Sequence, residues 1–145
     1  MIRVVLDTNV VVSAHIRPAG IPARILLLAF AKEFELCVSS EIVAEYDEVL
    51  RRPKFKIDSH VVDEFLQTLS ITAVAISPAT QIRAAADPDG DKFLVCALEA
   101  EADYLVTGNL KDYPTTTALS GGDPAESIIG TQIVSPREFL SIIAL

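Results

Sequence analysis

Four acidic residues stand where predicted elements of the chain should reach one edge of a sheet. Asp7 ends an apolar, β-branched run at 2–6 that is typical of a buried parallel strand. Asp91 begins a predicted helix, and Asp112 follows the turn that ends the next predicted strand. Glu45 lies on another predicted helix, between apolar neighbours. Ligands of open parallel sheets bind at the carboxyl ends of the strands, so these acids are candidates for one site.

Convergent carboxylates favour one kind of chemistry. Like charges repel, so gathering them costs stability unless a cation is present, and hard divalent cations prefer oxygen ligands. Mg²⁺ or Mn²⁺ fits such a set, and two ions about 3.5–4 Å apart can activate a water and stabilise the leaving oxygen of a phosphodiester. The four acids therefore indicate metal-dependent phosphodiester hydrolysis.

Each acid also has an ordinary structural explanation, which the sequence leaves open. Asp7 could cap the following helix, and Asp91 could be a helix cap or a first-turn residue. Glu45 could be a solvated helix residue, and Asp112 a loop acid.

Other metal sites find little support. The DPDGD segment at 87–91 lacks the Gly and the chelating Glu of a calcium loop, because those positions hold Lys92 and Leu98, and we interpret it as a turn. His15 and His60 have no partner at ligand spacing, which argues against zinc. The two cysteines, Cys37 and Cys96, lie in apolar surroundings and are expected to be buried thiols.

Hydrophobic periodicity predicts strands that alternate with helices. A first short helix should begin in the segment 10–14, and later helices at Ser39 or Ser40, at Asp58 or Ser59, and at Pro136. Two more helices are expected at 22–32 and 92–101, and strands at 2–6, 34–38, 71–76, 104–106 and 131–134. The segment 114–130 is expected to be a long surface loop. This alternation predicts an α/β fold with a mainly parallel sheet of four to five strands between two helical layers.

Composition narrows the class of protein. The chain has 145 residues, half of them hydrophobic, which predicts a single domain over 1–145 with one sizeable core. No apolar stretch reaches the roughly 18–20 residues of a membrane span, and no signal peptide is recognised, so we expect a soluble cytoplasmic protein that does not enter a membrane. The net charge of −8 argues against a broad basic surface for nucleic acid but does not exclude a nuclease.

One short basic run interrupts this acidic chain, at Arg51, Arg52, Lys54 and Lys56. Such a run is typical of a solvated helix end, where it also suits the helix dipole. The alternative is a patch in which Arg51, Arg52 and Lys54 follow an RNA backbone.

Several motifs together resemble the PIN-domain ribonucleases, especially the prokaryotic branch of toxins from toxin–antitoxin pairs. They are DTN at 7–9, SSEIVAEYDEVLRRPKF at 39–55, DPDGDKFLVCALEAEADYLVTGN at 87–109 and IVSPREFL at 133–140. The match covers nearly the whole chain in order. It implies a PIN-like three-layer α/β/α fold and maps an acidic cluster onto Asp7, Glu45 and Asp91.

The resemblance also implies roles for neighbouring polar residues. Thr8, Asn9 and Thr107 match positions that orient the acids or a bound water. Many family members have an acid where this chain has Asn109. Either Asp112 completes the site, or Asn109 serves as a neutral ligand.

The function predicted from these residues is a Mg²⁺- or Mn²⁺-dependent endoribonuclease, acting as the toxin of a toxin–antitoxin pair. The resemblance implies an RNA substrate, a small antitoxin partner and a homodimer. Two alternatives stay open. A phosphatase with Asp7 as nucleophile would usually have a second acid where this chain has Asn9. A catalytically weak or inactive PIN-fold module that binds RNA or protein is consistent with Asn109.

Overall fold

The core of the molecule is a five-stranded sheet in which all neighbouring strands run parallel. The computed structural model describes residues 1–77, 91–113 and 130–144. The strands follow the order β3-β2-β1-β4-β5, so β1 lies at the centre. Their bounds are Arg3–Leu6 for β1, Glu35–Ser39 for β2, Val74–Ile76 for β3, Tyr104–Val106 for β4 and Gln132–Val134 for β5. The predicted α/β class and parallel sheet are confirmed.

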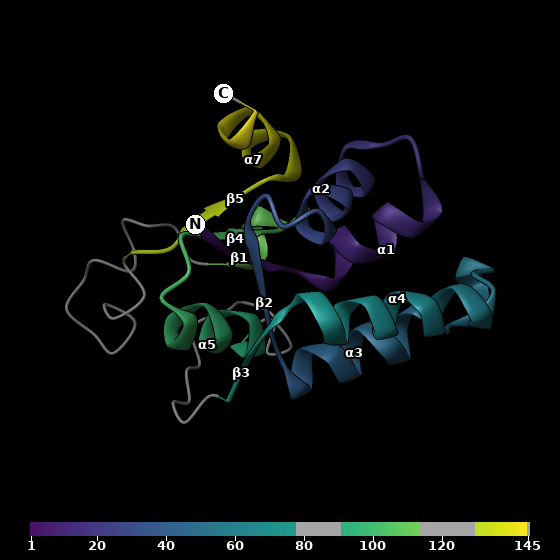
Figure 1. Cartoon of the computed structure of the whole chain (residues 1–145). Helices are drawn as coiled ribbons and strands as arrows, with labels where there is room; N and C mark the ends of the chain where they lie inside the picture. Colours follow the sequence, from purple (N-terminus) through teal and green to yellow (C-terminus); the bar gives the residue numbers. More distant parts are fainter. Residues whose placement is uncertain (78–90, 114–129, 145) are drawn as a thin grey trace.

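Six α-helices flank this sheet in the described part of the chain. They are α1 (Thr8–Ile16), α2 (Ile21–Phe30), α3 (Ser40–Leu50), α4 (Ser59–Thr72), α5 (Asp91–Ala100) and α7 (Pro136–Ile143), with short 3₁₀ turns η1 (Pro53–Phe55) and η3 (Leu110–Asp112). In Figure 1, α2 and α7 lie above the sheet, and α3, α4 and α5 lie below it. The three-layer arrangement is the PIN-like one that the sequence predicted.

Capping side chains fix where several helices begin. Ser39 Oγ accepts the backbone N–H of Ile42 at the start of α3. Asp58 caps α4 by accepting the N–H of His60. Ser135 forms a reciprocal capping box with Glu138 at the start of α7. These three starts agree with the sequence predictions, because a Ser or Asp cap supplies the acceptor that the first turn of a helix lacks.

Some predicted boundaries were wrong. The segment 71–76 was expected to be a strand, but α4 continues to Thr72 and β3 covers only Val74–Ile76. The helix extends because the backbone N–H of Ala73 and the hydroxyl of Thr72 bond to carbonyls one turn earlier. At the other end of the chain, α1 begins at Thr8 rather than inside 10–14, because Asp7 caps it. The expected turn at 87–90 and nearly all of the loop at 114–130 lie outside the described residues.

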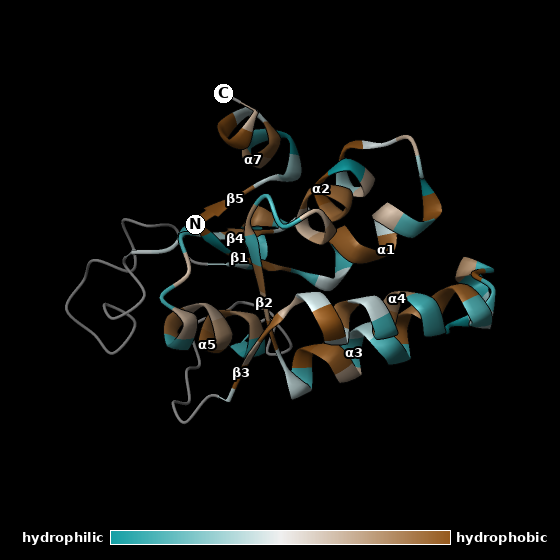
Figure 2. Cartoon of the chain, in the orientation of Figure 1, coloured by the Kyte–Doolittle hydropathy of each residue, from teal (hydrophilic) through white to brown (hydrophobic). Residues whose placement is uncertain are grey.

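The sheet interior is strongly apolar, as its composition predicts. Val4, Val5 and Leu6 of the central strand are fully buried. The strands consist mainly of hydrophobic residues, whereas hydrophobic and hydrophilic residues alternate along α3 and α4 (Figure 2). Cys37 and Cys96 are buried and unbridged, as expected.

Within residues 1–77, 91–113 and 130–144, no single helix is long and apolar enough to span a membrane. The pair formed by α1 and α2 reaches the necessary length and hydropathy together, but the two helices are bent by 104°.

Candidate functional site

Asp7 lies at the carboxyl end of the central strand, where it both caps α1 and faces a pocket. Its backbone N–H donates to the carbonyl of Val106 at 2.9 Å, which extends the pairing of β1 with β4. Its side-chain Oδ1 accepts the N–H of Thr8 at 2.7 Å. The expected cap is therefore confirmed through Oδ1, and Asp7 also lines the pocket, where its predicted role in a metal site stays a prediction.

The second oxygen, Asp7 Oδ2, is surrounded by side-chain donors. It accepts the hydroxyl of Thr107 at 2.8 Å, the hydroxyl of Tyr113 at 2.9 Å and the amide of Asn9 at 3.3 Å. Burial raises the pKa of Asp7 above its ordinary value, and the hydrogen bonds from Thr107, Tyr113 and Thr8 offset part of this effect. The carboxylate is therefore held in one orientation by groups from the first turn of α1 and from the segment 107–113.

Tyr113 was not predicted from the sequence. It is almost fully buried, and burial raises the pKa of its phenol well above the ordinary value. Its hydroxyl therefore keeps its proton and donates it to Asp7 in this arrangement. The only sequence signal was its position directly after Asp112, within the segment that follows the fourth strand.

Glu45 reaches the same pocket from α3. Its Oε2 accepts the hydroxyl of Thr8, and its Oε1 forms an ion pair with Lys92 Nζ at 2.6 Å. The neighbouring Tyr46 is buried and donates its hydroxyl to the carbonyl of Leu6, which ties α3 to the end of β1. Thr8 thus joins the two acids, because its N–H contacts Asp7 and its hydroxyl contacts Glu45.

Lys92 is the second residue that sequence reasoning missed. It follows Asp91 in the DPDGDKF motif, and only the tertiary fold brings it to Glu45, which is 47 residues away.

Hydrogen bonds join the turn at 107–109 to the start of α1. Asn9 Oδ1 accepts the N–H of Gly108 at 2.9 Å, and the N–H of Asn109 donates to Thr107 Oγ1 at 3.0 Å. A Cβ at position 108 would come within 3.3 Å of Asn9 Oδ1, so the close approach favours glycine there. Thr107 is fully buried. The supporting polar residues expected from the sequence therefore contact one another or Asp7.

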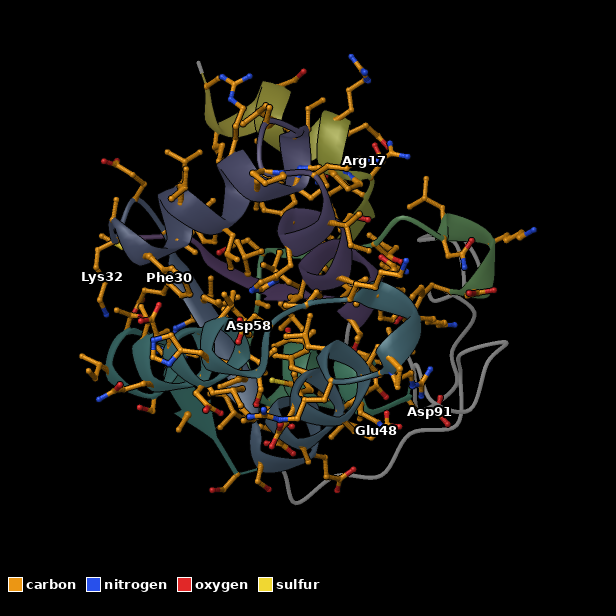
Figure 3. The ribbon with its side chains drawn as sticks, turned by 90° about the vertical axis from the view of Figure 1, so that its right-hand side faces the viewer. Arg17, Phe30, Lys32, Glu48, Asp58 and Asp91 are labelled. Atoms are coloured by element: carbon orange, nitrogen blue, oxygen red, sulfur yellow. The ribbon has the colours of Figure 1, made fainter. Side chains whose placement is uncertain are left out.

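The remaining predicted acids differ in their placement. Asp112, in η3, lines the pocket together with Asn109. Asp91 begins α5 and is only 9% exposed, and its successors Lys92 and Phe93 line the pocket. Figure 3, which looks onto the carboxyl edge of the sheet, labels Asp91 and Glu48 on the same side of the view. The structure thus brings Asp7, Glu45 and Asp112 to one cavity, whereas Asp91 is not among its lining residues and directly precedes two of them.

This cavity has a volume of about 890 Å³ and is strongly acidic. Five carboxylates and two basic side chains line it, a formal charge of −3. The charged residues are Asp7, Glu41, Glu45, Glu48, Asp112, Arg52 and Lys92. An anionic substrate would be repelled by this charge unless cations neutralised it.

The donor chemistry of the cavity fits a hard divalent cation. The acidic side chains that line it carry carboxylate oxygens, and these are the ligand atoms that Mg²⁺ and Mn²⁺ prefer. Across 1–77, 91–113 and 130–144, no three His, Cys, Asp or Glu side chains are grouped closely enough to form a metal site. In the observed arrangement the ammonium of Lys92 holds the cation position at Glu45. Asp7, Glu45 and Asp112 are the predicted metal ligands that line this cavity, and in the observed arrangement they are not grouped closely enough to form a three-ligand site.

The residues of the basic run differ in whether they line the cavity. Arg51 contacts Asp47, Ser59 and Asp63, so it joins α3 to α4 and lies outside the cavity lining.

Arg52 lines the cavity and pairs with Glu48 at 2.9 Å. Lys54 lies with its Nζ 5.1 Å from the ring centroid of Phe55, which is itself a cavity residue. Of the basic run, Arg52 therefore lines the cavity, and Lys54 lies beside the lining residue Phe55.

The fold and the site define an α/β protein with an acidic pocket at the carboxyl edge of an all-parallel sheet. A family model described as the PIN domain matches residues 3–111. The uncharacterized protein MJ1680 of Methanocaldococcus jannaschii is 34% identical over 111 residues, which cover 74% of this chain and 71% of that protein. The chain belongs to the PIN-domain family, whose fold is of the nuclease type.

Proposed function

We propose that the protein is a Mg²⁺- or Mn²⁺-dependent endoribonuclease. The observation that carries the proposal is the bridge through Thr8, which places the carboxylates of Asp7 and Glu45 on one acidic cavity. Membership of a family with a nuclease-type fold supports the same reaction class. RNA is the expected substrate because the motifs resemble those of PIN-domain ribonucleases.

In the proposed reaction the residues of the cavity have different parts. Asp7, Glu45 and Asp112 would hold the divalent cation, and one of these carboxylates accepts the proton of the attacking water. A bound divalent cation supplies positive charge for the phosphodiester and for the leaving oxygen. Thr107 and Tyr113 hold Asp7 Oδ2 in place and favour its ionised form. Asp91, the fourth predicted metal ligand, begins α5 directly before the lining residues Lys92 and Phe93.

The test is cleavage of a defined RNA set with and without Mn²⁺ by the parent and by Asp7→Asn. We expect Asp7→Asn to lose at least about 100-fold in rate, because general acid–base and metal-ligand groups contribute about that much. Asp103→Asn is a matched control, because Asp103 precedes the neighbouring strand β4 and binds the N–H of Arg3. Unchanged cleavage by Asp7→Asn would refute the proposal.

A second candidate is a module that binds RNA or protein without cutting, and Asn109 together with the Lys92–Glu45 pair favours it. The pair occupies an acid that a metal would need, and the amide of Asn109 contributes no charge. Mn²⁺ titration separates the two candidates. A nuclease should gain thermal stability with Mn²⁺ and lose that gain in Asp7→Asn, whereas the binding module should show neither effect.

A toxin role rests on the resemblance of the motifs. It predicts a short open reading frame beside the gene, whose product binds this protein and abolishes cleavage. A homodimer in the cytoplasm is part of the same proposal, and equilibrium sedimentation of the purified chain tests the dimer.

A further inference from the structure

Lys92 is a cation at a position where the start of a helix does not favour one. It is the second residue of α5, directly after Asp91. The amino end of a helix carries a partial positive charge, so an ammonium in the first turn is unfavourable there, whereas an acid such as Asp91 is favourable. The local structure of α5 therefore does not explain a lysine at position 92, and its contacts in the cavity are the next place to look for a reason.

The ammonium of Lys92 reaches the part of the cavity that holds the two acids. Its Nζ lies 2.6 Å from Glu45 Oε1, and its side chain is only 22% exposed. In the described part of the chain, Arg52 is the other basic residue of the cavity lining, and it is 46% exposed and paired with Glu48. A cation that is shielded from water acts more strongly on a nearby anion than an exposed one does. Lys92 is therefore the better placed of the two to act on a ligand at these acids.

The pair with Glu45 is one that Lys92 can exchange. Glu45 Oε2 accepts the hydroxyl of Thr8, so the carboxylate keeps a partner when the ammonium turns away. The lysine stem has four carbons and rotatable bonds, and its ammonium can donate three hydrogen bonds. Two cations at one carboxylate repel each other, so an ion bound to Glu45 would favour a different acceptor for Lys92. The ammonium can thus change its acceptor within the cavity while α5 stays in place.

We propose that Lys92 is the residue that contacts the scissile phosphate. Its ammonium, paired with Glu45 in the metal-free protein, donates to a non-bridging oxygen of the phosphodiester that lies against Asp7 and Glu45. It keeps its protons throughout and acts as a fixed positive charge, which stabilises the negative charge that builds up on these oxygens as water adds to phosphorus. The inference rests on the proposed ribonuclease function and adds to it a residue for the substrate.

Binding to a non-cleavable probe tests this contact without catalysis. The full-length parent and Lys92→Met are titrated at saturating Mn²⁺ with a single-stranded 2′-O-methyl oligoribonucleotide, by fluorescence anisotropy over a range of KCl concentrations. Each phosphate contact contributes about 0.7 to the slope of log Kd against the logarithm of salt concentration for a single strand. Lys92→Met should therefore lower that slope by about 0.7. It should also weaken binding about tenfold at low salt, as expected for one hydrogen bond to a charged group.

Two variants control for charge and position. Lys92→Arg keeps the positive charge and should keep the slope of the parent. Lys32→Met removes a lysine that precedes β2 at the opposite edge of the sheet, where Nζ donates to the carbonyl of Thr72 at 2.6 Å. Figure 3 labels Lys32 and Asp91 on opposite sides of the view. The slope of Lys32→Met should equal that of the parent, whereas a lysine at position 92 that only stabilised the fold would change the Tm of Lys92→Met and leave its slope unaltered.

Cleavage gives an independent measure of the same contact. Single-turnover cleavage of RNA by Lys92→Met at saturating Mn²⁺ should be about 100-fold slower than that of the parent, which is the typical loss when one donor to a developing negative charge is removed. Saturation with Mn²⁺ excludes a difference in metal occupancy as the cause. Lys92→Arg should recover most of the rate.

The outcomes separate this contact from the catalytic proposal. If the parent cleaves RNA but Lys92→Met has the salt slope of the parent, the contact is wrong and the ribonuclease stands. If the parent does not cleave but Lys92→Met lowers the slope and Lys92→Arg restores it, the contact stands and the ribonuclease is wrong. A parent that does not bind the probe, or a Lys32→Met variant that lowers the slope equally, overturns the contact.

Discussion

Replacing Lys92 with Met should change metal-free stability and metal affinity in opposite directions. Lys92 Nζ lies 2.6 Å from Glu45 Oε1, and the two side chains are only 22% and 16% exposed. Methionine keeps an unbranched stem and removes the ammonium. Without metal, Glu45 then shares the cavity with Asp7 and has lost its cationic partner. With metal, the same change removes a positive charge that repels the incoming ion.

The two magnitudes follow from burial and distance. The pair is intermediate between a surface and a buried ion pair, so breaking it should cost about 1–3 kcal/mol in the metal-free protein. That corresponds to a fall in Tm of about 3–9 °C for a domain of this size. At about 5 Å in a water-like dielectric, an ammonium and a divalent cation repel by about 1.7 kcal/mol. Since the lysine stem can swing away, we expect Mn²⁺ to bind about tenfold more tightly to Lys92→Met.

Thermal unfolding without metal and calorimetric titration with Mn²⁺ measure the two effects separately. Lys92→Arg keeps the charge and should bind Mn²⁺ as the parent does. Lys111→Met removes an exposed lysine of η3 that lies outside the cavity lining, and it controls for net charge. The reasoning is refuted if Lys92→Met binds Mn²⁺ no more tightly than the parent, or if Lys111→Met tightens binding equally.

Three further predictions concern the buried groups of the site and the sheet. Tyr113→Phe removes one donor to Asp7 and should lower the free energy of unfolding by about 1.5 kcal/mol in urea titrations, since hydrogen bonds to charged groups contribute about 1.5–3 kcal/mol; equal stability would contradict it. Burial raises the pKa of Asp7 above 3.8, so unfolding releases a proton between 3.8 and the folded-state value. The metal-free protein should therefore lose stability as the pH rises through that interval, and Asp7→Asn should lack this slope; a parent curve parallel to that of the variant would exclude it. Burial also raises the pKa of Cys37 to about 11 and that of Cys96 to about 12. Both thiols should resist a disulfide reagent at mildly alkaline pH until the protein unfolds, and fast labelling of the native state would contradict this prediction.

The sheet could be predicted because its strands carry a strong local signal. Continuous apolar runs at 4–6 and 105–106 are buried, and each run ends at a polar residue. The boundary at 71–76 could not be predicted, because β-branched residues favour a strand while the buried stripe of α4 at Val62, Phe65 and Leu69 continues the helix. Tertiary packing decided between two local preferences that the sequence leaves nearly balanced.

The acids of the site were partly predictable, and their partners were not. Asp7 and Asp112 follow strands, so the rule for parallel sheets places them at one edge without any knowledge of side-chain contacts. Lys92 and Tyr113 contact Glu45 and Asp7 across 47 and 106 residues. No periodicity encodes such a contact, because it depends on which face of a helix turns toward the edge after the sheet has assembled.

The two carboxylate oxygens of Asp7 have different hydrogen-bond partners, and this difference affects how the site can accept a ligand. Oδ1 accepts a backbone N–H, which points in a fixed direction and belongs to the cap of α1. Two of the donors to Oδ2 are the hydroxyls of Thr107 and Tyr113, whose protons can rotate about the C–O bond. A cation approaching Oδ2 can therefore replace those donors while the cap remains intact. The residue that starts α1 can thus change its partners in the cavity without unwinding the helix that it begins.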